Sequence, residues 1–264
     1  MGASVTPALQ AELERLATTP VLLVAVDFDG TLAPIVDRPA DARALPAARS
    51  AVLALLDLPR TKVAYVSGRA MASLEAVSDL PETALLAGSH GVEVRTEGHT
   101  SLDLTPEESA LRERLGAALT AVADPLEGVW IEEKPAGFGV HTRLASATDT
   151  ASAEAAALAA TEADVDALTV RHGQDILEFS VRGTTKGDAV ARLREQTGAT
   201  AVLFAGDDVT DEDGFGALGD GDLGIKVGSG DTAARHRVAG PEEMAAALAV
   251  LVEARRQYFS TAGH

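Results

Sequence analysis

Val21-Leu22-Leu23-Val24-Ala25-Val26 leads directly into Asp27-Phe28-Asp29-Gly30-Thr31, and this stretch decides the fold. Six apolar residues in a row predict a strand buried on both faces, as in a parallel sheet covered by helices. Side chains two positions apart along a strand point the same way, so we expect the carboxylates of Asp27 and Asp29 to share a direction. Two such charges beside a buried strand have to be neutralised by a metal ion or used chemically. A cation-assisted reaction is therefore the leading hypothesis.

The same pattern recurs along the chain. Four further short apolar runs end on glycine or a small polar residue, and they predict strands at 62–66, 84–87, 201–205 and 223–227. Helical stretches alternate with these runs, at 47–56, 70–77, 187–197 and 242–256. This alternation predicts an α/β fold with a doubly wound parallel sheet. Ligands bind such sheets beyond the carboxyl ends of the strands. The residues at those ends are Asp27, Asp29, Ser67 and Asp207.

The middle of the chain has a different rhythm, in which helix, strand and strand follow one another twice. The expected elements are a helix at 106–123, strands at 129–134 and 139–144 around Pro135-Ala136-Gly137, a helix at 148–162, and strands at 169–171 and 176–181 across the turn 172–175. This order predicts a small antiparallel sheet backed by two helices, inserted into the larger domain. We expect an α+β cap domain (αββαββ) at 104–182 and a core made of 1–103 and 183–264.

Composition limits the possible partners. The chain has 264 residues with 40 acidic and 22 basic side chains, a formal net charge of -18. This charge argues against nucleic acid or an anionic membrane as the main partner, because both would repel it. There is no cysteine, which excludes disulfides, thiolate catalysis and cysteine-ligated zinc. The N-terminal residues do not read as a signal peptide and no run reaches membrane-spanning length, so we expect a cytoplasmic protein, either a monomer or a weak homo-oligomer.

Asp27 and Asp29 have two interpretations. In the simpler one they cap a turn and the helix after it, as aspartates often do. Capping needs one carboxylate, however, and this loop places two beside an apolar strand. In the other, Asp27 is a nucleophile and metal ligand and Asp29 a general acid and base, while Thr31 and loop amides hold phosphoryl oxygens.

The segment Gly206-Asp207-Asp208-Val209-Thr210-Asp211-Glu212-Asp213 concentrates acids that would repel one another without a cation. A solvated turn is one alternative. An EF-hand is another, but Val209 stands where its first ligand should be, and Asp220 stands where its final glutamate should be. Oxygen ligands from two strand ends, with phosphate and water, favour Mg²⁺. Asp207 is the expected direct ligand, with Asp211 supporting a water or the loop.

Lys186 begins a helix after an extended stretch, and most lysines in such places are simply solvated. Together with Ser67, however, it supplies what two acidic clusters lack, namely donors for the oxygens of a transferring phosphoryl group.

This ordered set resembles the four motifs of the haloacid dehalogenase-like phosphatase superfamily. Within that superfamily, Val66-Ser67-Gly68-Arg69, Gly88-Ser89-His90-Gly91-Val92-Glu93 and residues 206–212 resemble trehalose-6-phosphate phosphatases. In the predicted cap, Glu132-Glu133-Lys134, His141-Thr142-Arg143 and Leu177-Glu178 are similar to that family's sugar-binding pattern. Many relatives carry Lys-Pro after the last cap glutamate, whereas this chain has Ser180-Val181.

The resemblance implies an Mg²⁺-dependent phosphatase that hydrolyses trehalose 6-phosphate, a small-molecule sugar phosphate, through an aspartyl-phosphate. The implied catalytic residues are Asp27, Asp29, Ser67 and Lys186, and the implied metal ligands are Asp27, Asp29, Asp207 and Asp211. Phosphate binding is implied for Gly30, Thr31, Ser67, Gly68 and Lys186. Substrate binding is implied for Arg69, His90, Glu132, Lys134, Arg143 and Glu178.

Several alternatives stay open. Glu132 and Lys134, at a spacing of two, could form an ordinary ion pair on a strand face instead of holding hydroxyls, and His90 could be a structural loop residue. The same core could serve another sugar phosphatase or a phosphosugar mutase, acting for example on sucrose phosphate or a mannosyl phosphate. Gly228-Ser229-Gly230-Asp231-Thr232-Ala233 suggests a dinucleotide-binding protein, but that fingerprint normally follows the first strand of its unit. A catalytically inactive metal-binding module is the last alternative.

Overall fold

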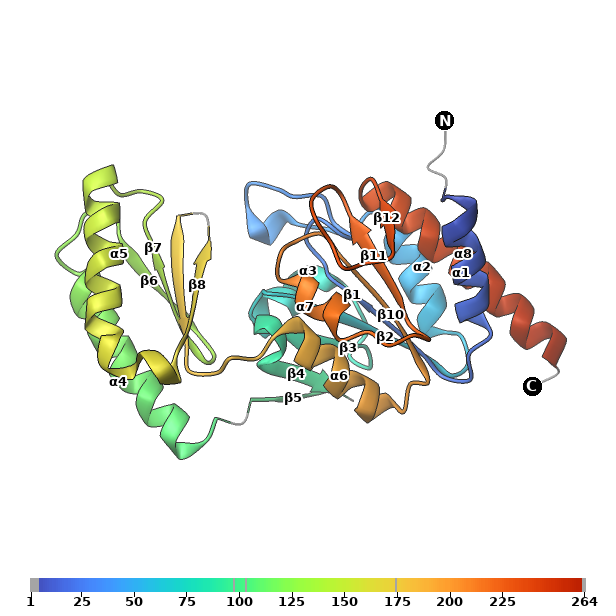
Figure 1. Cartoon of the computed structure of the whole chain (residues 1–264), viewed down its shortest axis with the longest axis horizontal. Helices are drawn as coiled ribbons and strands as arrows, with labels where there is room; N and C mark the ends of the chain where they lie inside the picture. Colours follow the sequence, from blue (N-terminus) through green and yellow to red (C-terminus); the bar gives the residue numbers. More distant parts are fainter. Residues whose placement is uncertain (1–4, 97, 103, 174, 263–264) are drawn as a thin grey trace. The chain divides into compact units, whose positions relative to one another are not determined.

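The computed structural model describes residues 5–96, 98–102, 104–173 and 175–262, except for the side chain of residue 262. It contains two compact units, one made of Met1–Ser101 with Thr184–His264 and the other of Leu102–Gly183 (Figure 1). Residue 103, the predicted end of the first core segment, and Gln174 of the predicted turn lie outside the described residues. No helix in the described ranges combines the length and the apolarity that crossing a bilayer requires.

The first unit is built on an eight-stranded sheet in the order β12-β11-β10-β1-β2-β3-β4-β5. Its strands are β1 (Leu22–Val26), β2 (Thr61–Val66), β3 (Leu85–Gly88), β4 (Glu93–Thr96), β5 (His99–Ser101), β10 (Ala201–Gly206), β11 (Leu223–Val227) and β12 (His236–Val238). The strands from β12 to β3 are parallel, which confirms the predicted doubly wound α/β class. The sequence analysis did not predict β4 and β5, which add an antiparallel edge.

Both faces of this sheet are covered by helices, which explains why its strands are continuously apolar. The helices are α1 (Pro7–Ala17), α2 (Pro46–Leu56), α3 (Met71–Ser78), α6 (Lys186–Thr197), α7 (Asp211–Gly216) and α8 (Pro241–Ala262), with short 3-10 turns at Pro39–Asp41 and Ser89–Gly91. Leu22, Val24 and Val26 of β1 pack in one buried cluster with α1, α2, α3 and α8. Leu23 and Ala25 pack in a second cluster with α6 and α7.

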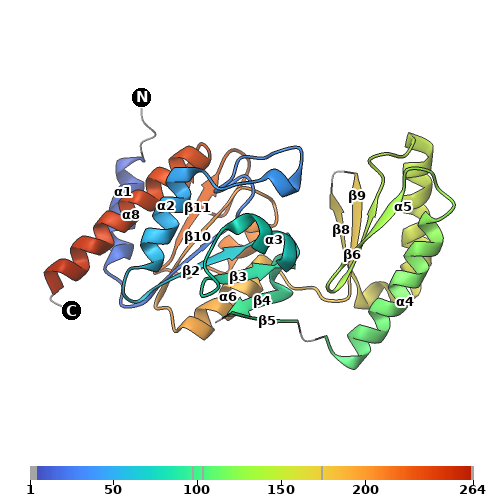
Figure 2. The ribbon, with the colours of Figure 1, turned by 180° about the vertical axis from the view of Figure 1, so that it is seen from behind.

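The second unit has an antiparallel sheet in the order β6-β7-β9-β8 and two long helices (Figure 2). Its elements are α4 (Pro106–Ala123), β6 (Trp130–Lys134), β7 (Gly137–His141), α5 (Ala147–Thr161), a 3-10 turn at Glu162–Ala167, β8 (Thr169–Gly173) and β9 (Ile176–Ser180). The predicted strand at 139–144 was placed too late. Lys134 pairs with Gly137 across a two-residue loop, so Gly137 belongs to the strand and the strand ends before Thr142.

The two faces of the second sheet differ in character because side chains alternate along each strand. Phe138 and Val140 of β7, with Leu177 and Phe179 of β9, are buried. This side faces the helices, since a Cβ on Gly116 of α4 would lie 2.5 Å from Phe138 Cζ. The opposite parity carries a mostly polar set in register across the strands: Trp130, Glu132, Lys134, Gly137, Gly139, His141, Arg171, Ile176, Glu178 and Ser180. We call this surface the open face.

Candidate functional site

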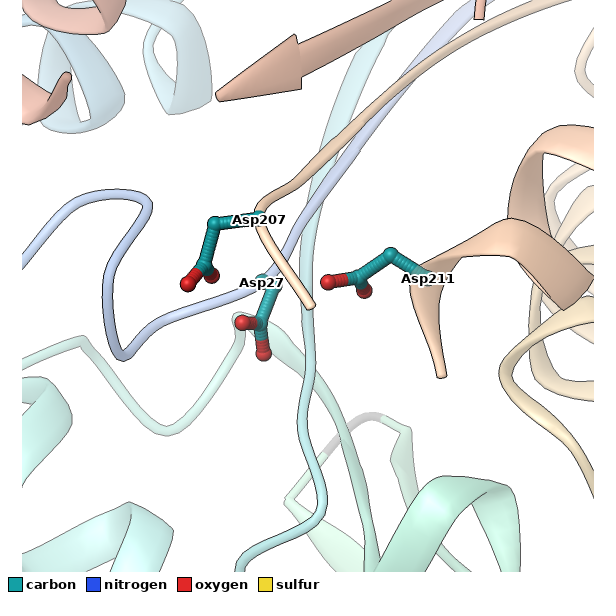
Figure 3. A group of neighbouring side chains, drawn as sticks. All are labelled: Asp27, Asp207 and Asp211. Carbon is teal, nitrogen blue, oxygen red and sulfur yellow. The ribbon is translucent and has the colours of Figure 1, made fainter. Parts of the chain in front are cut away.

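Three carboxylates converge at the carboxyl edge of the large sheet (Figure 3). Asp27 follows β1, Asp207 follows β10 and Asp211 begins α7; one oxygen of each lies within 4.8 Å of the others. The first two meet because β1 and β10 are parallel neighbours, with Val26 at the end of β1 in register with Ala205 of β10. Asp27 and Asp211 are buried. We call these three residues the carboxylate group.

Through its side chain, Lys186 forms ion pairs with two members of the carboxylate group. It begins α6, it is only 2% exposed, and its Nζ lies 3.1 Å from Asp27 Oδ1 and 2.7 Å from Asp211 Oδ1. Burial alone would lower the pKa of Lys186, but these two carboxylates outweigh it and raise the pKa above its usual value. The ammonium therefore stays charged.

One ammonium does not balance three carboxylates. Desolvation raises the pKa of Asp27 well above its ordinary value; Lys186 opposes this, while Asp211 and Asp207 add to it. Desolvation also raises the pKa of Asp207, against the hydrogen bond from Thr31. Clustered, partly desolvated oxygen donors with excess negative charge suit a hard divalent cation, so the residues present fit the predicted Mg²⁺.

The loop after β1 fits closely against Asp207. Thr31 is fully buried, and its Oγ1 donates a hydrogen bond of 3.0 Å to Asp207 Oδ1. Gly30 has a φ of +75°, and a Cβ at this position would lie 2.0 Å from Asp207 Oδ2. Only glycine combines that backbone conformation with that approach. The loop thereby sets the position of a carboxylate that is distant in the sequence.

Asp29 is not part of the carboxylate group, and its role as a metal ligand stays a prediction. Its Oδ2 accepts a 2.5 Å hydrogen bond from Arg69 Nε, and its Oδ1 accepts a 2.6 Å bond from Arg69 Nη2. The expectation that Asp27 and Asp29 share a direction assumed strand geometry. The strand ends at Val26, and the alternation of side chains does not extend into the loop.

The structure brings Ser67, Gly68, Arg69 and His90 together beyond β2 and β3. Ser67 is buried, and its Oγ accepts a 3.2 Å hydrogen bond from the backbone N–H of Arg69. The backbone N–H of His90 donates to Ser67 O at 2.9 Å. A Cβ on Gly68 would lie 2.8 Å from His90 Cε1, so the imidazole packs against this glycine.

One buried acid and one buried lysine near this edge were missed by the sequence analysis. Glu93 of β4 accepts hydrogen bonds from Met71 N and Ser89 Oγ, and so holds the start of α3. Lys226 of β11 is only 3% exposed and donates to the carbonyl oxygens of Asp207 and Asp208 at 2.8 and 3.1 Å. A lone lysine inside the apolar run 223–227 was the signal that could have revealed it.

Glu212 links the acidic loop to the glycine-rich segment 228–233. Its Oε1 lies 3.4 Å from Lys226 Nζ, and its Oε2 accepts hydrogen bonds from Ala233 N at 2.8 Å and Thr232 Oγ1 at 3.2 Å. Segment 228–233, which suggested a dinucleotide-binding protein, is therefore held by Glu212 within this unit.

In the second unit, Lys134 pairs with Glu178 and lies 3.9 Å from Glu132 Oε2. Glu132 and Glu178 are both in register with Gly139 on the open face. Arg143 is not brought to this group. It follows the end of β7, it is 63% exposed, and its Nε lies 3.8 Å from Asp175 Oδ2. Arg143 stays apart because the strand ends at His141.

Comparisons with known proteins assign the chain to a family. The family model for trehalose-phosphatase matches residues 25–242. The chain belongs to the trehalose-phosphatase family. It is 32% identical over 241 residues to the trehalose-6-phosphate phosphatase of Escherichia coli (strain K12), covering 88% of this chain and 86% of that protein. Membership of the trehalose-phosphatase family makes the chain a phosphatase, a phosphoric monoester hydrolase.

Some relatives are longer than this chain. A trehalose-phosphate phosphatase of Mycobacterium marinum is 34% identical over 252 residues, and the alignment covers 92% of this chain but 61% of that protein.

Solved structures show the same fold. The C-terminal domain of trehalose-6-phosphate phosphatase from Candida albicans has a TM-score of 0.75 at 22% identity, over 96% of this chain and 98% of that one. A haloacid dehalogenase-like hydrolase from Bacteroides thetaiotaomicron has a TM-score of 0.65 at 14% identity, over 87% of this chain and 98% of that one. The predicted haloacid dehalogenase-like fold is therefore confirmed.

Proposed function

We propose that this protein hydrolyses trehalose 6-phosphate to trehalose and inorganic phosphate, as a step of trehalose biosynthesis. The observation that carries the proposal is the carboxylate group around Lys186 at the carboxyl edge of the sheet, in a chain of the trehalose-phosphatase family. Asp27 of this group is a carboxylate able to attack phosphorus. Lys186 is a fixed ammonium able to stabilise the negative charge of the phosphoryl oxygens.

In the first step, a carboxylate oxygen of Asp27 attacks phosphorus, and the bond between phosphorus and the sugar oxygen breaks. Asp29 gives its proton to the departing sugar oxygen, so that trehalose leaves neutral and an aspartyl-phosphate remains on Asp27. Lys186 and Ser67, with Gly30, Thr31 and Gly68 of the neighbouring loops, bind the phosphoryl oxygens and stabilise their charge.

In the second step, water attacks the phosphorus of the aspartyl-phosphate while Asp29 accepts a proton from it. The bond to Asp27 breaks, phosphate is released and the carboxylate is restored. The enzyme returns to its starting protonation state, so both steps balance.

The proposed cofactor is Mg²⁺, held by Asp27, Asp207 and Asp211. When bound, it would supply positive charge that neutralises the phosphoryl oxygens and the carboxylates around them. Lys226 supports the site indirectly, because it fixes the backbone that carries Asp207.

We further propose that residues 104–182 form a cap domain that recognises the sugar. Glu132, Lys134 and Glu178 offer acceptors and a donor to several hydroxyls at once, and leaving them unpaired is costly, which makes such a site selective. The ion pairs they form with one another would be exchanged for hydroxyl contacts. Arg69 and His90 in the first unit and Arg143 in the second are the other proposed substrate contacts. A cytoplasmic location and a monomeric or weakly associating state stay predictions.

A panel of sugar phosphates, assayed for phosphate release with and without Mg²⁺, tests substrate and cofactor together. We expect turnover of trehalose 6-phosphate that is lost when the metal is chelated. Turnover of sucrose phosphate or a mannosyl phosphate in its place would favour another sugar phosphatase, and transfer of phosphate to a second sugar position would favour a mutase.

Three variants complete the test. Asp27→Asn should lower turnover about a thousandfold or more while keeping the fold, because it deletes the nucleophile. Asp37→Asn changes an exposed aspartate a few residues on and should leave the rate unchanged. Lys134→Ala should impair hydrolysis of trehalose 6-phosphate far more than hydrolysis of p-nitrophenyl phosphate. Equal losses of activity on both esters would contradict sugar recognition by the second unit.

A further inference from the structure

Trp130 is exposed on the open face and stacks on a histidine. It begins β6 and is directly opposite His141 of β7 in the antiparallel register. The two rings are parallel within 1°, with centroids 4.6 Å apart. Trp130 nevertheless stays 39% exposed. This strand therefore presents a large, rigid aromatic surface on the side of the sheet opposite to its apolar core.

His141 also holds one of the proposed sugar contacts. Its Nε2 lies 2.9 Å from Glu132 Oε2. A carboxylate only accepts hydrogen bonds, so the network assigns the proton to Nε2 of the imidazole. Glu132 in turn lies near Lys134, which pairs with Glu178. A continuous row of side chains thus leads from the indole to the charged groups, all on the open face.

Packing in the apolar core does not account for this position of the indole. Trp130 has the same parity as Glu132 and Lys134, whereas the buried aromatic side chains Phe138 and Phe179 have the other parity. A tryptophan that served the core would stand on that second side, where burying its ring would contribute most to stability. Its ring stacks on the imidazole of His141 on the mostly polar side instead.

We propose that Trp130 is a stacking plate for one glucose ring of the substrate, and that His141 is a positioning residue that keeps the indole upright and aims Glu132. This inference rests on the proposed function and deepens it. A pyranose ring has a face of C–H groups and a rim of hydroxyls. The C–H face complements the electron-rich face of an indole, and the hydroxyl rim complements the carboxylates and ammonium along the row.

The chain contains a single tryptophan, so its tryptophan emission, excited selectively at the red edge of the absorption, reports on Trp130 alone. Trehalose 6-phosphate, trehalose and inorganic phosphate would each be titrated into Asp27→Asn protein in Mg²⁺ buffer, with binding measured in parallel by calorimetry. We expect the two sugars to change the tryptophan emission with saturation and phosphate alone to leave it unchanged. Calorimetric binding of trehalose 6-phosphate without an emission change would overturn the inference.

Turnover by variants is the second test. Trp130→Ala should raise the KM for trehalose 6-phosphate about tenfold, the size expected for one lost stacking contact. The KM for p-nitrophenyl phosphate should change less than about twofold. Trp130→Phe keeps a ring and should retain most of the affinity. Leu144→Ala, which truncates a 76% exposed apolar side chain outside the open face, is the matched control and should leave the KM for both substrates unchanged. Equal KM values for Trp130→Ala and the control would overturn the proposal.

His141 is tested by rescue. His141→Ala should raise the KM for trehalose 6-phosphate with little change in the rate on p-nitrophenyl phosphate, whereas His141→Gln keeps an N–H donor for Glu132 and should recover part of the loss. Equal effects of the two variants, or equal losses on both esters, would contradict a positioning role. Failure of the unmodified protein to hydrolyse trehalose 6-phosphate would overturn the proposed function itself, an outcome distinct from normal hydrolysis without a Trp130 effect.

Discussion

Arg69 binds both carboxylate oxygens of Asp29, through Nε at 2.5 Å and Nη2 at 2.6 Å. The guanidinium is only about a tenth exposed, so this bidentate pair is partly shielded from water. Both oxygens of Asp29 accept N–H groups in this arrangement, whereas an acid catalyst has to present a proton to the leaving group. We therefore expect Asp29 to leave Arg69 before the sugar is released.

Asp29→Asn should separate the two chemical steps. Nitrophenolate leaves readily without being protonated, but a sugar alcohol does not. The variant should therefore give a burst of nitrophenolate close to one per enzyme from p-nitrophenyl phosphate, followed by slow turnover, and no burst with trehalose 6-phosphate. Rapid-quench kinetics and mass spectrometry of the trapped protein measure this. A steady unreduced rate on both esters would exclude Asp29 as the acid and base.

Gly30→Ala and Gly198→Ala form a matched pair, since both glycines have positive φ values of +75° and +63°. Each substitution should cost about 1–2 kcal/mol in free energy of unfolding through backbone strain. A Cβ on Gly198 meets nothing within 4 Å, but one on Gly30 would displace the carboxylate of Asp207. Only Gly30→Ala should therefore lose turnover and stabilisation by Mg²⁺ in thermal melts. Full activity of Gly30→Ala would refute the importance of this contact.

Lys226→Met should destabilise the protein and weaken metal binding. It leaves the carbonyls of Asp207 and Asp208 without their buried donor, a loss of about 1–3 kcal/mol, and leaves Glu212 without its cation. Urea unfolding and the shift in melting temperature with Mg²⁺ are the measurements. Lys62→Met, at an exposed lysine of β2, is the control and should stay within about 0.5 kcal/mol of the unmodified protein.

The metal-free protein should lose stability as pH rises above the ordinary aspartate range of about 4. The pKa values of Asp27 and Asp207 are raised in the folded state, so the folded protein holds more protons than the unfolded chain until pH passes those raised values. Lys186 also has a raised pKa, but its contribution to stability is constant in this window because it is lost only at much higher pH.

Urea unfolding between pH 5 and pH 8 measures this dependence. Asp207→Asn should reduce the slope, and saturating Mg²⁺ should reduce it as well, because a cation favours the ionised carboxylates. The control Asp37→Asn should keep the original slope. Stability of the metal-free protein that rises with pH over this range would contradict the buried-carboxylate explanation.

The sequence predicted those parts of the fold that depend on local pattern. Continuous apolar runs identify strands covered on both faces, and the carboxyl ends of parallel strands necessarily meet at one edge, which is why Asp27 and Asp207 are found together. Lys186 was predicted because, with Ser67, it supplies donors that two acidic clusters lack, although its position at a helix start alone would suggest a solvated residue.

Features that depend on loop conformation or on tertiary packing could not be predicted from local sequence pattern. The partner of Asp29 depends on the turn after β1, whose dihedral angles no periodicity specifies. The start of β7 was misplaced because Gly137 was assigned to the turn, whereas a Cβ there would lie 1.9 Å from Phe179 O of the neighbouring strand. The hydrogen-bond acceptors of Lys226 are two carbonyl oxygens that follow another strand, and no side-chain pattern encodes a backbone acceptor.

Side chains along the strands of the second sheet alternate between two faces, and the two faces have different roles. Residues of one parity pack on α4 and α5 and maintain the fold, while residues of the other parity form the open face. Replacing Trp130, Glu132 or Glu178 exchanges a surface group and leaves the packed layer intact. Substrate preference can therefore diverge among relatives by point substitution without loss of foldability, whereas inserting one residue into β6 would exchange the two sides and damage both.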